Sequence, residues 1–194
     1  MRIIVLILAL FSAQPAFAWF DLSGKRVGFS FGEVRYDTDG LYRDYDYDKR
    51  DISFGIYTAA PVNDWIDLEV HYTHLGQYEV RESVFHYWKD TFHSLSLAAR
   101  FHTDVANNLE LYGRAGFGVI LLEQDAILWE GGTPLALASG GGELQFSVGA
   151  AWRFHRHVAL TLEYDHHSFL VESGYSGDHL QSLSGVRAGL RYTF

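Results

Sequence analysis

Cysteine is absent from the 194-residue sequence, and proline occurs only three times. Without cysteine no disulfide can support the fold, which excludes a small disulfide-linked exported domain. Beyond its first residues the chain also lacks any run of about 20 uninterrupted apolar residues, so an ordinary helical membrane protein is excluded. The formal net charge is −9, and this acidic balance argues against a nucleic-acid partner, which favours a basic surface.

The N-terminus has the order of features found in an export signal. Arg2 precedes an apolar stretch over residues 3–11, and Ala16-Phe17-Ala18 follows as an A-x-A cleavage site. The apolar stretch is too short for a transmembrane helix, which needs about 20 residues to cross the hydrocarbon. We therefore predict a signal peptide over residues 1–18 and one mature domain over residues 19–194.

The rest of the sequence alternates between apolar and polar residues with a period of two, which is typical of β-strands. Short connections near 59–64, 103–108 and 155–157 alternate with long ones near 37–50, 79–90, 122–142 and 171–181. An even number of strands with this rhythm predicts an up-and-down antiparallel meander. The eight alternating segments are 27–31, 51–58, 66–74, 95–101, 109–119, 144–154, 158–164 and 185–194.

The polar faces of these segments carry five acids and five arginines, with glycine and small residues between them. A water-facing surface mixes in other polar residues, whereas a narrow closed interior needs each charge to be paired. Eight strands enclose only enough space for side chains. The ten charged residues are Asp67, Glu69, Arg100, Glu110, Arg114, Arg153, Glu163, Asp165, Arg187 and Arg191.

The balanced charges distinguish between two barrel architectures that share the same alternation of apolar and polar residues. A soluble lipocalin-type barrel has an apolar interior, whereas an outer-membrane barrel has an apolar exterior and a polar lumen. The paired charges favour the second. We predict an all-β, eight-stranded antiparallel up-and-down transmembrane β-barrel with a plugged lumen. The structural lumen charges are expected to be Glu69, Arg100, Glu110, Arg114, Arg153, Glu163, Arg187 and Arg191.

The alternation continues to the last residue, where Tyr192 and Phe194 share the apolar face. The signal peptide, the eight strands and this C-terminus resemble the OmpA-type outer-membrane β-barrel family over residues 19–194. The resemblance implies a place in the outer membrane of a Gram-negative bacterium, among outer-membrane lipids and lipopolysaccharide. It also implies that the barrel-assembly machinery reads Tyr192 and Phe194 as an assembly signal.

The function expected from this resemblance is structural or interactive rather than catalytic. The long loops would support envelope integrity, or adhesion to an extracellular ligand that the sequence does not name. The acidic segment 45–51 is expected to be a solvated loop that bridges lipopolysaccharide through divalent cations. A narrow ion pore is an alternative of a different class.

A second alternative rests on His166 and Ser168, which share the outward face of the seventh strand. They resemble the His-x-Ser pair of the outer-membrane lipid A deacylases, and so keep a lipid A-modifying hydrolase open. Two features depart from that pattern. No outward position of the last strand is acidic, and Phe169 stands where those enzymes usually have asparagine. We therefore predict no catalytic residue.

The ten histidines raise the question of a metal site. His155 and His157 flank a tight turn, and His166, His167, Asp178 and His179 could meet at the outer rim. No spacing matches a known ligand motif, and the Asp37–Gly40 segment lacks the later acids of a calcium loop. We predict neither a metal site nor a cofactor.

Cleavage of the signal peptide gives the first testable prediction. The A-x-A pattern at 16–18 directs cleavage after Ala18, so N-terminal sequencing of the mature protein should begin at Trp19. A mature protein that retains Met1 would contradict export by this route.

Overall fold

The described part of the chain is built almost entirely of β-strands. The computed structural model describes residues 23–37, 46–47, 50–83, 86–127, 135–173 and 177–194. None of these residues belongs to a helix long and apolar enough to cross a membrane. The strands are β1 (Arg26–Asp37), β2 (Asp46–Tyr47), β3 (Arg50–Pro61), β4 (Ile66–Ser83), β5 (His86–Ala106), β6 (Leu109–Ile127), β7 (Leu135–His155), β8 (Val158–Ser173) and β9 (Gly177–Thr193).

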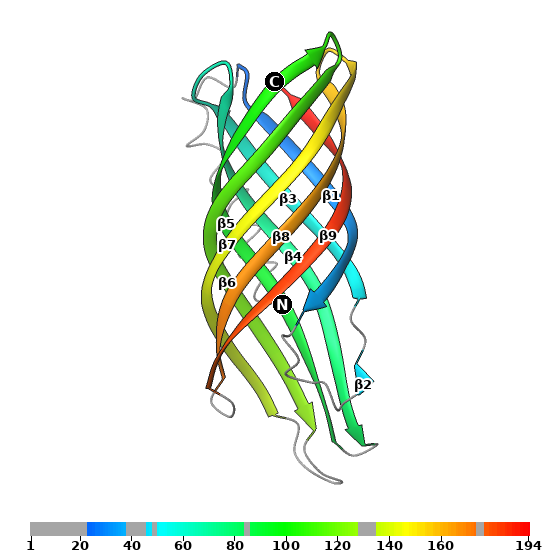
Figure 1. The fold of residues 1–194 in the computed structure, drawn as a ribbon, viewed down its shortest axis with the longest axis vertical. Coiled ribbons are helices and arrows are strands. Elements are labelled where there is room, and N and C mark those ends of the chain that lie inside the picture. Colours follow the sequence, from blue (N-terminus) through cyan, green and yellow to red (C-terminus); the bar gives the residue numbers. More distant parts are fainter. Residues whose placement is uncertain (1–22, 38–45, 48–49, 84–85, 128–134, 174–176) are drawn as a thin grey trace, which may run out of the picture.

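Eight long strands close into a barrel, as predicted (Figure 1). Consecutive long strands pair antiparallel, β4 pairs with β5, and β9 returns to pair with β1. The register of that last pair runs from Arg26 opposite Thr193 to Asp37 opposite Ser182. The two-residue strand β2 adds to the outer end of β4. Closure leaves no free sheet edge within the barrel wall, which is what a strand structure in lipid requires.

The short turns lie at the same end of the barrel as the C-terminus (Figure 1). In the first of them, the backbone N–H groups of Trp65 and Ile66 donate to the Asn63 side-chain oxygen at 3.0 and 2.8 Å. The other two turns reverse the chain between β5 and β6 and between β7 and β8. The prediction of short turns near these positions is confirmed.

Apolar side chains cover the outside of the barrel. Phe31, Val148 and Leu162 are 57%, 62% and 59% exposed, which water would disfavour and hydrocarbon favours. Near the short turns, aromatic rings form pairs on this outer face, with centroids 5.1–6.0 Å apart. Such a girdle marks the membrane interface of a barrel. The pairs are Trp65 with Phe101, Trp152 with Phe154, and Tyr192 with Phe194.

The strands continue much further outward than the sequence analysis predicts. Strands β5 and β7 each have 21 residues, about twice the 9–11 that cross a membrane. Most of the segments 79–90 and 122–142, predicted as loops, is therefore paired strand. The prediction was wrong because backbone pairing does not end where lipid ends. Only 84–85 and 128–134 in these segments lie outside the described residues.

The burial pattern inverts in this outer extension. Inside it, Tyr36 packs against Tyr78 with centroids 5.1 Å apart, and Phe92 packs against Phe169 at 5.4 Å. The Tyr36 hydroxyl donates to the Leu75 carbonyl at 2.7 Å. Outside, charged residues such as Arg35 and Glu123 replace the apolar ones. We call the buried apolar cluster the outer plug: Val34, Tyr36, Leu75, Tyr78, Phe92, Ile120, Leu122, Phe169 and Leu183.

Candidate functional site

Charged side chains fill the barrel interior between the outer plug and the short turns, which face the periplasm in outer-membrane barrels. Their side chains are at most 7% exposed, apart from Arg26 at 16%. A buried charge is stable only when it is paired and hydrogen-bonded. The six carboxylates are Asp67, Glu69, Glu110, Glu143, Glu163 and Asp165, and the five arginines are Arg26, Arg100, Arg114, Arg187 and Arg191.

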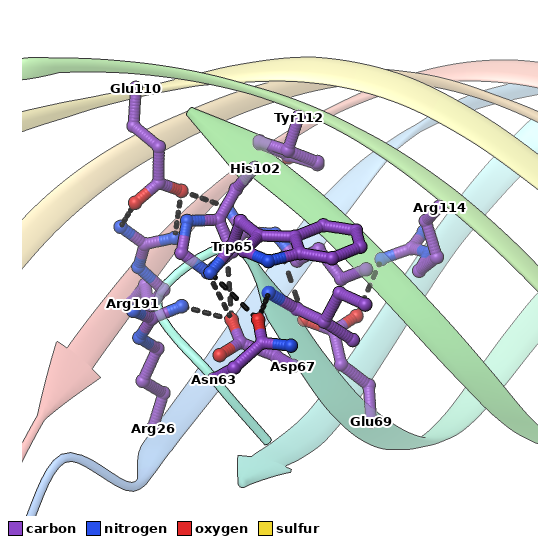
Figure 2. Close-up of polar contacts among 12 residues, drawn as sticks. Arg26, Asn63, Trp65, Asp67, Glu69, His102, Glu110, Tyr112, Arg114 and Arg191 are labelled. Carbon is purple, nitrogen blue, oxygen red and sulfur yellow. Dashed lines mark hydrogen bonds and ion pairs between the residues drawn. The ribbon is translucent and has the colours of Figure 1, made fainter. Parts of the chain in front are cut away.

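Two arginines converge on Glu110 near the periplasmic mouth (Figure 2). Arg191 donates from its two terminal nitrogens to the two carboxylate oxygens, at 2.8 and 3.1 Å. Arg100 binds Glu110 as well, and reaches Asp67 at 3.2 Å. Arg26 closes the group from β1 by binding Asp67. Bidentate pairing of this kind fixes both orientation and charge.

A second group lies deeper in the lumen and is continuous with the first. Arg114 lies 3.6 Å from Glu69 and 3.4 Å from Glu163. Arg187 lies 3.2 Å from Glu163 and donates to Asp165 at 3.1 Å. Because Arg100 links carboxylates on β4 and β6, and Arg114 links carboxylates on β4 and β8, the network ties distant parts of the wall together.

His167 lies at the outer end of this network and is completely buried. Its Nε2 is 2.9 Å from Asp165, and its Nδ1 contacts Glu143, which also accepts a hydrogen bond from Ser94. His167 therefore lies between two buried carboxylates and joins Glu143 to the network through Asp165.

Most residues predicted for the lumen lie in this network. Arg153 instead lies at the periplasmic mouth, where it donates to Asp104 at 2.8 Å and keeps 34% of its side chain exposed. It lines a mouth cavity of about 320 Å³ together with Arg26 and His102. The narrow interior also explains why glycine occupies an inward position at 149, because a Cβ there would lie 2.6 Å from the Tyr112 ring.

The sequence analysis missed several members of the network. The Nε2 of His71 is 2.8 Å from the Glu69 carboxylate, and the Tyr112 hydroxyl donates to Glu163 at 3.1 Å. His71 and His167 each follow a lumen acid by two residues. Because residues two apart in a strand face the same side, this strand parity alone assigns both histidines to the lumen. Glu143 was missed because it adjoins a segment predicted as a loop. Arg26 was missed because it precedes the first predicted strand.

His166 points to the opposite side of β8 from His167. Its Nε2 is 3.0 Å from the Ser168 hydroxyl, and its Nδ1 is 2.9 Å from the Ser184 hydroxyl on β9. His166 and His167 therefore do not meet at the outer rim, because adjacent strand residues face opposite ways. The side chains of Asp178 and His179 lie outside the described ones.

No group of three or more histidines, aspartates and glutamates in the described part of the chain has the geometry to enclose a metal ion.

The sequence matches the family described as outer membrane protein beta-barrel domain over residues 3–194. The chain therefore belongs to this family of outer-membrane β-barrels, and it resides in the outer membrane of a Gram-negative bacterium. The OmpA-type resemblance is confirmed at this level. No curated protein matches the sequence.

Solved structures share the fold at low sequence identity. Neisserial surface protein A (NspA) is 18% identical with a TM-score of 0.63, covering 89% of this chain and 98% of its own. Ail, the attachment invasion locus protein of Yersinia pestis, is 17% identical with a TM-score of 0.51, covering 88% and 99%. OprG from Pseudomonas aeruginosa is 14% identical with a TM-score of 0.50, covering 89% and 96%.

The lumen network generates a stability prediction. Replacing Glu163 by Gln leaves Arg114 and Arg187 each short of a buried partner, which typically costs about 3–5 kcal/mol. We expect a clear fall in the urea unfolding midpoint of the protein in detergent. The exposed turn variant Asp64→Asn is the control and should change stability by no more than about 0.5 kcal/mol. Equal effects of the two variants would contradict the assigned network.

Proposed function

We propose that this protein is a non-catalytic surface-contact barrel, which holds its extracellular segments away from the membrane for interaction with a partner. The observation that carries the proposal is the outer extension with its own apolar core. About ten residues of β5 and of β7 lie beyond the lipid band, and at a tilt of about 40° they correspond to a height of roughly 25 Å. We call these outer ends of the strands the stalk. A membrane anchor alone needs no such length.

The closed lumen supports the same proposal. Paired arginines and carboxylates fill the inner part, and the outer plug, with Phe92 and Ile120 fully buried, covers it. Eight-stranded barrels have little interior space to begin with. A narrow ion pore, the alternative of a different class, gains no support from this arrangement.

Charge favours a cationic partner. The four outward segments 37–50, 79–90, 122–142 and 171–181 contain 13 acids and 5 basic residues, a formal charge of −8. Ail has been crystallised with the heparin analogue sucrose octasulfate, a polyanion, and that structure has a TM-score of 0.53 to this chain. The acidic surface of the present protein would repel such a ligand. Complementary charge steers a basic partner toward the stalk instead.

The test measures binding of poly-L-lysine and of heparin to the full-length protein in lipid nanodiscs. We expect poly-L-lysine to bind, with an affinity that falls as salt rises because exposed charges are screened. The double variant Glu123→Gln/Asp125→Asn should weaken binding several-fold, because both exposed acids lie on the stalk. Asp64→Asn, an exposed acid of a periplasmic turn, is the matched control. Binding of heparin in preference to poly-L-lysine would contradict the proposal.

A second candidate, a lipid acyl hydrolase, is favoured by the hydrogen bonds of His166. Ser168 is in position to be a nucleophile and His166 its base, while Ser184 occupies the place of the orienting carboxylate. In such a reaction Ser168 Oγ attacks an ester carbonyl and its proton passes to His166, which protonates the leaving alcohol. Water then releases the fatty acid from the serine.

The position of the serine on β8 fits ester chemistry. Ser168 is ten residues from the start of β8 at Val158, which corresponds to roughly 25 Å of membrane depth. This distance brings it to the outer boundary of the hydrocarbon, where acyl esters lie.

Mass spectrometry of lipids from membranes that contain the protein tests this candidate. If it is correct, the wild type releases fatty acid from lipopolysaccharide, whereas Ser168→Ala and His166→Ala release none. Ser182→Ala is the control, because Ser182 is directly opposite Ser168 on β9 but makes no bond to His166. Absence of release above membranes without the protein would eliminate the candidate.

A further inference from the structure

Two histidines from neighbouring strands form a pair on the outside of the barrel. His74 on β4 and His93 on β5 are directly opposite in the register, and their ring centroids are 4.9 Å apart with planes at 46°. Both are partly exposed. Apolar Val70 and Leu95 lie on the membrane side of the pair, whereas polar Gln77 and Thr91 lie on the outer side. The pair is therefore at the outer edge of the apolar band, within reach of external water.

The separation of the two rings fits a shared metal ion. Metal–nitrogen bonds are about 2.0–2.1 Å long, and the centroid of an imidazole lies about 1.1 Å behind its nitrogen. Two imidazoles at roughly 90–110° around one ion therefore have centroids about 4.5–5.2 Å apart. The observed 4.9 Å lies inside this range. Within the described residues His74 forms no hydrogen bond, and the Nε2 of His93 forms none either.

Neighbouring groups hold both rings in place. The Tyr72 hydroxyl lies 3.0 Å from His93 Nδ1, so it can accept the Nδ1 proton and leave Nε2 free to bind. Such outer-shell bonds commonly select the tautomer of a metal-binding histidine. The Phe54 ring packs on His74 with centroids 4.8 Å apart. Both rings are thus oriented before any ion arrives.

A backbone irregularity follows His74 directly. The register shifts between His74 and Gln77, with Gly76 at φ 86°. The Gln77 N–H then donates to the Asp51 carboxylate at 2.7 Å, which fixes the backbone just after His74. Bulges of this kind often re-aim side chains next to functional sites.

Electrostatics near the pair favour a cation. Among the described residues, the carboxylates of Asp51 and Glu123 act on His74, and Glu123 also acts on His93. In this described part of the chain, no arginine or lysine acts on either ring. A metal ion entering from outside would meet two imidazoles and a negative field.

From this geometry we infer that His74 and His93 form an open surface site for a divalent transition-metal ion of the Cu²⁺, Ni²⁺ or Zn²⁺ class. The two imidazole nitrogens bind the ion, and water fills the remaining positions. Imidazole ligands suit these ions, and Cu²⁺ binds most tightly in the general affinity order. This site is separate from the proposed partner contact, because it lies at the base of the stalk rather than on the outward segments.

The experiment titrates Cu²⁺ into the full-length protein folded in detergent, followed by calorimetry and electron paramagnetic resonance. We expect one tight site whose spectrum contains coupling to two imidazole nitrogens. His74→Ala and His93→Ala should each weaken binding by at least about tenfold, and Tyr72→Phe by about tenfold or less. A shift in gel mobility between unheated and boiled samples verifies that each variant is folded.

Two controls isolate the site. His166→Ala removes another partly exposed outward histidine and should leave Cu²⁺ binding unchanged. His155→Ala/His157→Ala removes the periplasmic pair, whose centroids are 6.0 Å apart, and should also leave the tight site intact. The inference is overturned if His74→Ala and His93→Ala bind Cu²⁺ like the wild type, if the periplasmic double variant abolishes the tight site, or if no tight site exists.

Discussion

The need to pair every backbone polar group in hydrocarbon governs this protein. An unsatisfied N–H or C=O in the bilayer costs several kcal/mol, so the sheet has to close. Closure through β1 with β9 and β4 with β5 then forces alternate side chains into a space just wide enough to hold them. The buried charges follow from that geometry, since only paired groups are stable there. The paired charges of the lumen are thus a consequence of closure as much as a feature of the sequence.

Strand parity made the fold predictable, and it also assigned most of the lumen. Residues such as Glu110 and Arg191 are inward because each lies two residues from another inward position, whatever their partners are. The partners within the lumen network were not predictable, because residues such as Arg191 and Glu110 are 81 positions apart and meet only when the barrel closes. The same limit applies to His74 and His93, whose pairing depends on register. The two-residue alternation could have placed His71 and His167 inward, but a histidine is a weaker sign of a charged lumen than an arginine or a glutamate.

The sequence pattern did not predict the length of the strands, for a different reason. The sequence analysis looked for apolar residues on the lipid side, and that signal ends where the lipid ends. On β5, Leu95 and Leu97 face outward, whereas three residues nearer the outer end Phe92 is buried inward. The alternation of apolar and polar residues continues into the outer extension, but there the apolar residues face inward. A segment with apolar residues on the other face resembles a loop when only one face is followed.

The outer plug has a consequence for engineering. Phe92, Ile120 and Phe169 hold the outer ends of the strands together from within. Insertions between two strands are tolerated best where the flanking backbone is paired, as it is on both sides of the β6–β7 connection. A peptide inserted between β6 and β7 would be carried well clear of the lipid headgroups by a support that is covalently part of the barrel. The molecule is therefore a natural scaffold for displaying antigens or enzymes on the bacterial surface.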